Sequence, residues 1–141
     1  MISFFKNKEI NIIDNVNFLT KIASLLVHAA KIDEVYTNQE EEIIKKTLIK
    51  LGAKNSEINQ IMSKAAINEE NSNQILDFTK EVKKMPEVDK IKIIEALWQI
   101  IYSNKNADIY EINLMRRLAG LLYIDNRIMG DIKERVKKEF L

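Results

Sequence analysis

Two polar segments of this 141-residue chain carry the side-chain oxygens that bind hard cations. Asp33 and Glu40 lie in the first segment, and Asn104, Asp108 and Glu111 lie in the second. Carboxylate and amide oxygens are the ligands that Ca²⁺ and Mg²⁺ prefer, but a tight Ca²⁺ site needs about six to eight of them. If the fold brings the two segments together, these five residues form a candidate site that binds Ca or Mg weakly.

Most of these residues also have an interpretation as helix caps. Thr37 is followed three residues later by Glu40, and Asp108 is followed three residues later by Glu111. In a capping box, the first side chain accepts a hydrogen bond from the backbone of the third residue on, whose carboxylate accepts one in return. A cap contributes about 1 kcal/mol. Capping explains the spacing without Asp33, so we favour it, and the divalent-metal site is the alternative.

The rest of the sequence offers little material for catalysis. His28 is the only histidine and there is no cysteine, so neither a thiolate nor a second imidazole can complete a transition-metal or nucleophile–base site. No glycine-rich phosphate loop and no nucleophile elbow occur. The sequence therefore predicts a protein that is not an enzyme and that requires no cofactor.

The elements that must position these residues are predicted to be helices. Three glycines and one proline leave little turn chemistry for connecting strands. Apolar residues recur instead at the spacing of one helical face, as in Ile12, Val16, Leu19, Ala23 and Leu26. We predict an all-α bundle of about seven helices after a short lead over residues 1–10. Their expected positions are about 11–31, from a cap at Thr37 to a left-handed stop at Gly52, from a cap at Asn55 or Ser56 onward, about 75–85, from Pro86 to Ser103, after a cap at Asp108, and after a cap at Asp125.

The single tryptophan, Trp98, lies in the apolar stretch Leu97–Ile101. An exposed Trp98 would be a candidate anchor for a partner protein, whereas its apolar neighbours favour a place in the core. A buried indole usually finds a partner for its N–H. We therefore predict a core residue whose N–H is hydrogen-bonded.

The chain repeats itself once. Leu26 aligns with Leu97, an offset of 97 − 26 = 71 residues, and the same offset aligns Thr37 with Asp108. Two copies of this period indicate a domain with pseudo-twofold symmetry rather than an open solenoid. Each half has too few apolar faces to bury alone. We predict a single domain over residues 11–141, with halves at about 11–70 and 71–141 that share one core.

At these repeated segments the chain resembles the TerB-like (tellurite resistance) family. The family's signature is an acidic loop, Ala-Asp-Gly-x-[Ile/Leu]-[Asp/Ser/Thr]-x-x-Glu, present once per half. The two copies here span residues 32–40 and 103–111. Three framework segments are also similar to the family: Asp77–Lys80, Glu95–Trp98 and Leu114–Ala119. The resemblance runs from about residue 19 to the end of the chain.

The resemblance implies an all-α bundle of two pseudo-symmetric halves. It also implies that the paired acidic loops bind a divalent metal and that the protein acts in metal stress. Both loops depart from the signature, however. Glu34 and Lys105 replace the glycines, and Asn104 replaces the second aspartate. These changes weaken the implication of a metal site.

Charge and hydropathy narrow the expected partners. Lys and Arg total 22 against 21 acids, and this net charge of +1 argues against a nucleic-acid partner. No apolar run reaches the roughly 20 residues of a membrane-spanning helix, and the amino terminus does not resemble a signal peptide. We expect a cytoplasmic, non-catalytic domain that binds protein partners or acts as a scaffold. A divalent-metal sensor is the alternative.

Overall fold

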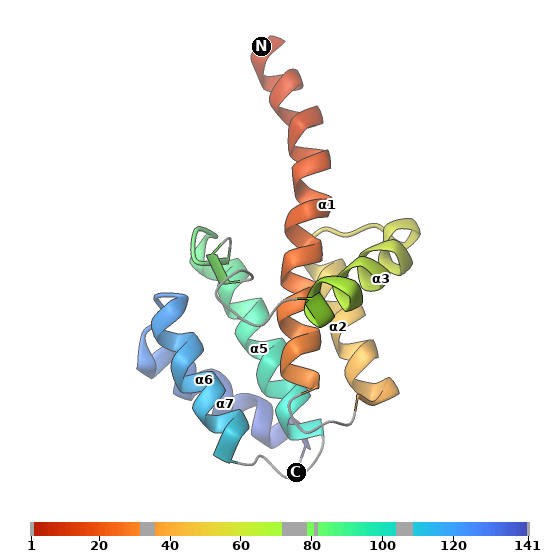
Figure 1. Cartoon of the computed structure of the whole chain (residues 1–141). Coiled ribbons are helices and arrows are strands. Elements are labelled where there is room, and N and C mark those ends of the chain that lie inside the picture. The colour runs from red at the N-terminus through yellow and green to blue at the C-terminus, as the bar shows by residue number, and fades with distance from the viewer. Residues whose placement is uncertain (1, 32–35, 72–78, 81, 104–108, 141) are drawn as a thin grey trace.

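The computed structural model describes residues 2–31, 36–71, 79–80, 82–103 and 109–140. For residues 2–15, 71 and 109–111 it describes the backbone only. This part of the chain contains no strand, so the all-α prediction is confirmed. Its helices are arranged as shown in Figure 1: α1 (Ile2–Ala30), α2 (Asn38–Lys50), α3 (Asn55–Asn71), α5 (Glu87–Ser103), α6 (Ile109–Leu121) and α7 (Asn126–Phe140).

The first helix is longer than predicted. It begins at Ile2 rather than near residue 11, so the short lead expected over residues 1–10 is helical. Residues 1–10 contain neither glycine nor proline, and nothing there stops a helix. The prediction was wrong because apolar spacing reports which part of a helix is buried, not where the helix begins.

Two other predictions concern the segment before α5 and the place of Pro86. The helix expected over about 75–85 lies partly outside the described residues, and within them Thr79, Lys80 and Val82 are helical. Pro86 stands directly before α5 rather than in its first turn, and its carbonyl accepts hydrogen bonds from the N–H groups of Asp89 and Lys90. Proline is tolerated at this position because no intrahelical bond needs its missing N–H.

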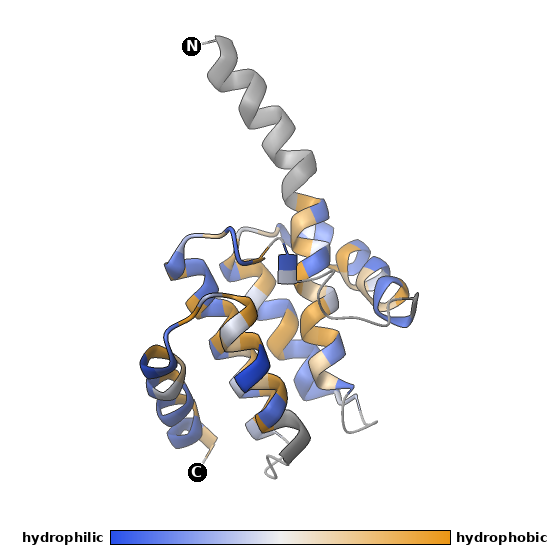
Figure 2. Ribbon diagram, turned by 60° about the vertical axis from the view of Figure 1, so that its left-hand side comes forward, coloured by the Kyte–Doolittle hydropathy of each residue, from blue (hydrophilic) through white to orange (hydrophobic). Residues whose placement is uncertain are grey.

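The core lies between α1 and α5. Helix α3 packs on α1, α7 packs on α5, and α2 contacts α1, α3 and α5. Leu25 and Leu26 of α1 and Leu97 and Ile101 of α5 are fully buried in one continuous apolar cluster. Figure 2 shows apolar faces directed inward and polar faces outward. Buried residues of both halves therefore belong to one core cluster.

The internal repeat is confirmed by the helix boundaries. Helix α6 begins and ends 71 residues after α2, since 109 − 38 = 71 and 121 − 50 = 71. Helix α7 likewise begins 71 residues after α3, since 126 − 55 = 71.

The turns that end α2 and α6 repeat as well. The N–H of Ala53 donates to the Leu48 carbonyl at 2.9 Å, and that of Ile124 donates to the Ala119 carbonyl at 3.0 Å. Both are Schellman turns, which place one residue in a left-handed conformation. Gly52 is that residue in the first turn, with φ of 108°, and Tyr123 in the second, with φ of 56°. The predicted stop at Gly52 is confirmed.

The caps of α3 and α7 differ. Asp125 was predicted to cap α7, and its Oδ1 accepts from the Arg127 N–H at 2.8 Å. Helix α3 begins at Asn55, so the residue before it is Lys54, and the expectation of an Asn55 or Ser56 cap was wrong. Its backbone N–H donates instead to the Glu57 carboxylate at 3.4 Å. Lysine has no side-chain acceptor with which to cap a helix.

Trp98 lies in the core, only 3% exposed, as predicted. Its ring stacks on Tyr102 with centroids 5.9 Å apart, and the Lys133 ammonium lies 5.5 Å from its centroid. The expected hydrogen bond of its N–H was wrong, because Nε1 is buried without a partner in the described structure. Tyr102 and the Lys133 ammonium interact with the face of the indole ring, but neither contact provides an acceptor for its N–H.

Candidate functional site

The first predicted acidic segment forms a helix cap. The Thr37 N–H donates to Glu40 Oε1 at 2.8 Å, and the Glu40 N–H donates to the Thr37 hydroxyl oxygen at 3.1 Å. This reciprocal pair is the predicted capping box. Glu40 is 0% exposed, so its carboxylate is held inside the fold at the start of α2. Capping at this position is confirmed.

The remaining residues of the predicted metal site cannot be placed in the same way. Asp33, Asn104 and Asp108 lie outside the described residues, as does the side chain of Glu111. Their approach to Glu40 therefore stays a prediction. Among the side chains that the structure does describe, no group of three or more His, Asp or Glu is arranged to hold a metal ion.

Tyr36 lies directly before the capping box, and the pKa of its phenol is shifted by its surroundings. Partial burial, together with the negative charges of Glu41 and Glu40, raises the pKa of the Tyr36 phenol to about 12. The phenol therefore stays neutral near pH 7 and can donate a hydrogen bond. Burial makes the larger contribution to this shift, and the two carboxylates add to it.

The end of α1 is attached to α3 by a small charged cluster. Glu69 Oε1 lies 3.4 Å from His28 Nδ1, and Glu69 Oε2 lies 3.3 Å from Lys31 Nζ. The His28 side chain is 30% exposed. A half-exposed cluster of this kind fastens two helices together, although such pairs contribute little to stability.

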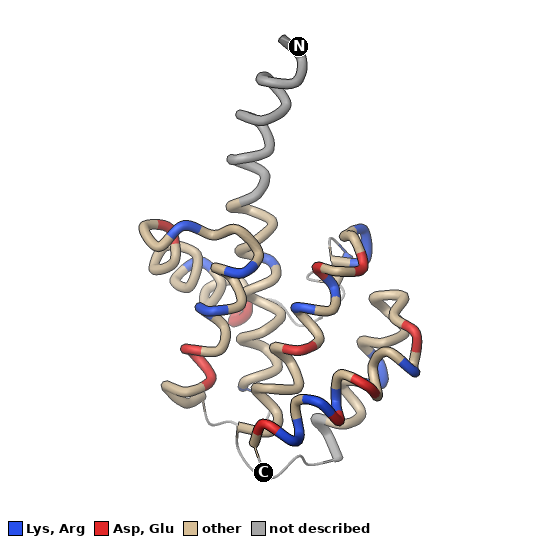
Figure 3. Tube along the Cα trace, turned by 180° about the vertical axis from the view of Figure 1, so that it is seen from behind, with Lys and Arg blue, Asp and Glu red and all other residues tan. Residues whose placement is uncertain are grey.

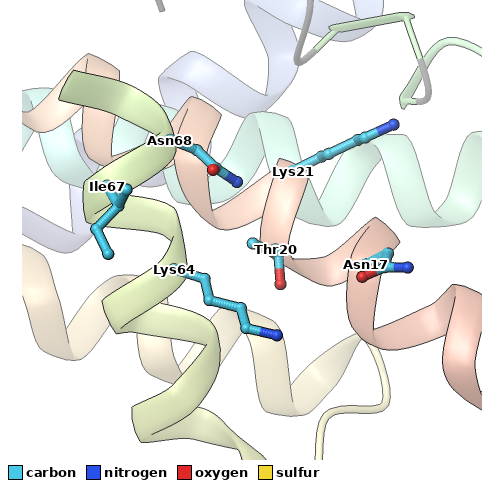
Figure 4. Close-up of a pocket in the computed structure, with 6 residues that line it drawn as sticks. All are labelled: Asn17, Thr20, Lys21, Lys64, Ile67 and Asn68. Carbon is cyan, nitrogen blue, oxygen red and sulfur yellow. The ribbon is translucent and has the colours of Figure 1, made fainter. Parts of the chain in front are cut away.

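A groove between α1 and α3 is the most distinctive surface feature in the described part of the chain. Its volume is about 320 Å³. Each helix contributes three residues at positions i, i+3 and i+4, and both sets are shown in Figure 4: Asn17, Thr20 and Lys21 from α1, and Lys64, Ile67 and Asn68 from α3.

The lining of this groove combines charge, amides and one exposed apolar side chain. Lys64 extends from α3 toward α1, whereas the Lys21 amine points outward on the other side of Thr20 (Figure 4). Ile67 is 57% exposed. The buried Thr20 hydroxyl donates to the Val16 carbonyl at 2.7 Å, which leaves its oxygen able to accept. The six residues offer cationic, hydrogen-bonding and apolar contacts within one concave surface.

Sequence reasoning missed this groove. The signal was present, because polar residues at i, i+3 and i+4 share one face of each helix. What the sequence could not provide was the pairing of α1 with α3 that brings the two faces together.

Two other grooves are lined differently. One of about 390 Å³ lies between α2, α5 and the end of α7, where half-buried Ile43 and Phe140 are bordered by Glu42 and Lys46. Another of about 270 Å³ lies beside Phe18 and Met85. Both include acidic as well as basic side chains, whereas the two charged residues that line the α1/α3 groove are both lysines.

Acidic and basic residues are interspersed along α7, and both signs of charge also occur on α2, α3 and α5 (Figure 3). Within the described ranges, no helix is both long and apolar enough to cross a membrane.

Comparison with known proteins identifies the family. A search of curated proteins found no match, and neither did a search of the solved structures. The family model for tellurite resistance protein TerB matches residues 19–134, which is most of the chain and includes both halves of the repeat. The chain therefore belongs to the TerB family.

Proposed function

We propose that this chain is a non-catalytic protein-interaction domain whose partners act in the response to tellurite or metal stress. The observation that carries the proposal is the α1/α3 groove, in which Ile67 is 57% exposed beside polar side chains from two helices. The family description, tellurite resistance protein TerB, supports the link to stress.

A single exposed apolar side chain needs no explanation, because such residues are common on protein surfaces. Ile67 is different in its setting, since it borders a concave surface that carries hydrogen-bonding groups. Binding sites are typically concave, with apolar contacts and a few polar groups that fix the orientation of the ligand. A protein segment can supply both kinds of contact, through its side chains and its backbone.

In-cell cross-linking followed by affinity purification tests this proposal. The tagged chain is compared with Leu97→Asp, which introduces a charge at a fully buried position and is expected to unfold the domain. We expect defined proteins to be recovered with the folded chain and lost with the variant, with recovery increasing after exposure to tellurite. Recovery of the same proteins with both forms, or of none with either, would contradict an interaction role.

A further inference from the structure

We propose that the α1/α3 groove binds an acidic segment of a partner protein that also carries an apolar side chain. This inference rests on the proposed interaction function and adds the surface and the chemistry of the ligand. The supporting observation is charge complementarity, because both charged residues among the six that line the groove are lysines.

Of the two lysines, Lys64 is the one whose surroundings and direction favour binding of a carboxylate. It is exposed and forms no ion pair or hydrogen bond within the described structure. Its ammonium extends into the groove toward α1 (Figure 4). An incoming carboxylate therefore does not have to displace an existing partner of Lys64, which makes this position a favourable one for a negative charge.

The directions of the two lysines favour an extended ligand over a small anion. The Lys21 amine points away from Lys64, with Thr20 between them (Figure 4). A single phosphate cannot contact two amines that diverge in this way, whereas a peptide with two acidic side chains can reach both.

The amides favour a peptide for a second reason. Asn17 and Asn68 each offer both donors and an acceptor, which matches the N–H and C=O groups of a peptide backbone. A phosphate offers mainly acceptor oxygens, whereas a peptide backbone offers donors and acceptors in alternation along its length. Ile67, on the same helix as Lys64, provides an apolar contact for another side chain of the peptide.

Selection from a displayed library of random twelve-residue peptides tests the inference on the intact chain. We expect enrichment of peptides that combine Asp or Glu with an apolar residue. The selected peptides are then synthesised with a fluorescent label, and binding is measured by fluorescence anisotropy. Inorganic phosphate is included as a competitor.

Three variants locate the binding site. Lys64→Glu reverses the free charge and is expected to weaken binding about tenfold or more, because like charges at an interface are strongly unfavourable. Ile67→Ser removes the apolar contact without altering charge and is expected to weaken binding by several-fold. Lys54→Glu is the matched control, because it makes the same charge change at an exposed position directly before α3 and should leave binding within about twofold.

The outcomes separate this inference from the proposed function. Equal loss of binding in Lys64→Glu and Lys54→Glu, or no enrichment of acidic peptides, would overturn the groove as an acidic-peptide site. Displacement of the peptide by millimolar phosphate would overturn it in favour of a phosphate ligand. If cellular partners are still recovered with Lys64→Glu, the interaction function stands and only the surface is wrong.

Discussion

The turns that end α2 and α6 have the same hydrogen bonds but different residues at the left-handed position. Gly52 occupies it in the first half and Tyr123 in the second. Glycine adopts this conformation without strain, whereas a residue with a side chain loses roughly 1–2 kcal/mol. The residues after these positions, Ala53 and Ile124, are both buried. Burial of the following residue therefore holds the second turn in its conformation without glycine.

This comparison shows how the two halves adopt the same backbone conformation at this turn with different residues. Where local chemistry and packing agree, as at Gly52, the turn can be recognised from the sequence. Where they disagree, as at Tyr123, packing decides the conformation, and the lysine ammonium of Lys83 lies 5.7 Å from the exposed Tyr123 ring. A cation over an exposed ring contributes about 0.5–1 kcal/mol, which offsets part of the strain.

The largest expected effect comes from separating the halves. Fragments 1–70 and 71–141 are expected to be largely unfolded alone, because α1 and α2 contact α5 across the shared core. When mixed, they are expected to associate and regain helical signal. Circular dichroism of each fragment and of the mixture measures this. A fragment that melts cooperatively as a monomer near the temperature of the whole chain would show that the core is not shared.

The next largest effect is expected at two equivalent core positions, where truncation to alanine should lower the free energy of unfolding by different amounts. Trp98 aligns with Val27 at the repeat offset, since 98 − 27 = 71, and both are buried. Trp98→Ala is expected to lower the free energy of unfolding by about 3–5 kcal/mol through cavity formation. Val27→Ala removes less volume and is expected to cost about 2 kcal/mol. Denaturant unfolding followed by circular dichroism measures both. A cost under about 1 kcal/mol for Trp98→Ala would contradict its role in the core.

Exchanging the turn residues tests the opening comparison directly. Gly52→Tyr is expected to cost about 1–2 kcal/mol, because a side chain is placed at positive φ. Tyr123→Gly is expected to change stability by less than about 1 kcal/mol. The strain is relieved, but the Lys83 contact is lost and the unfolded chain gains freedom. Chemical denaturation of both variants gives the two values. Equal costs would mean that the turns are energetically equivalent.

The caps offer a smaller test. Asp125→Ala is expected to destabilise the protein by about 1 kcal/mol, because the Arg127 N–H loses its acceptor. Lys54→Asp places the second half's cap residue in the first half and is expected to stabilise by up to about 1 kcal/mol. Thermal melts of the two single variants and the double variant provide the comparison. The effects should add, since the sites belong to separate helix ends.

The smallest expected effect concerns the predicted metal site. We expect Ca²⁺ and Mg²⁺ to bind at about millimolar affinity, because few oxygen ligands are available. At a concentration near Kd, such a ligand adds only about 0.4 kcal/mol. Calorimetric titration is made on the intact chain and on Asp33→Asn with Glu111→Gln. Micromolar binding that is lost in the double variant would make a metal sensor the leading function.

The sequence was most informative where signals are local. The capping box at Thr37 and Glu40, the stop at Gly52 and the cap at Asp125 each depend on a few neighbouring residues, and all three were found. The start of α1 was missed, because a helix can extend beyond its buried stripe.

Features that depend on contacts between helices were harder to predict. Among the described residues, the N–H of Trp98 has no hydrogen-bond partner, and this outcome depends on how α5 packs, which no local pattern encodes. The α1/α3 groove arises only when two separate polar faces meet. Of the five predicted metal ligands, Glu40 is the only one whose side chain the structure places, and the assembly of the site still depends on the titration.

The position of Trp98 also has a consequence for spectroscopy. It is the only tryptophan of the chain, and its indole is buried on α5 beside Lys133 of α7. Its fluorescence therefore reports the packing of the second half, whereas far-ultraviolet circular dichroism averages over every helix. Coincident unfolding curves from the two signals would indicate a single cooperative transition. Fluorescence that changes first would show that α5 and α7 separate while other helices persist.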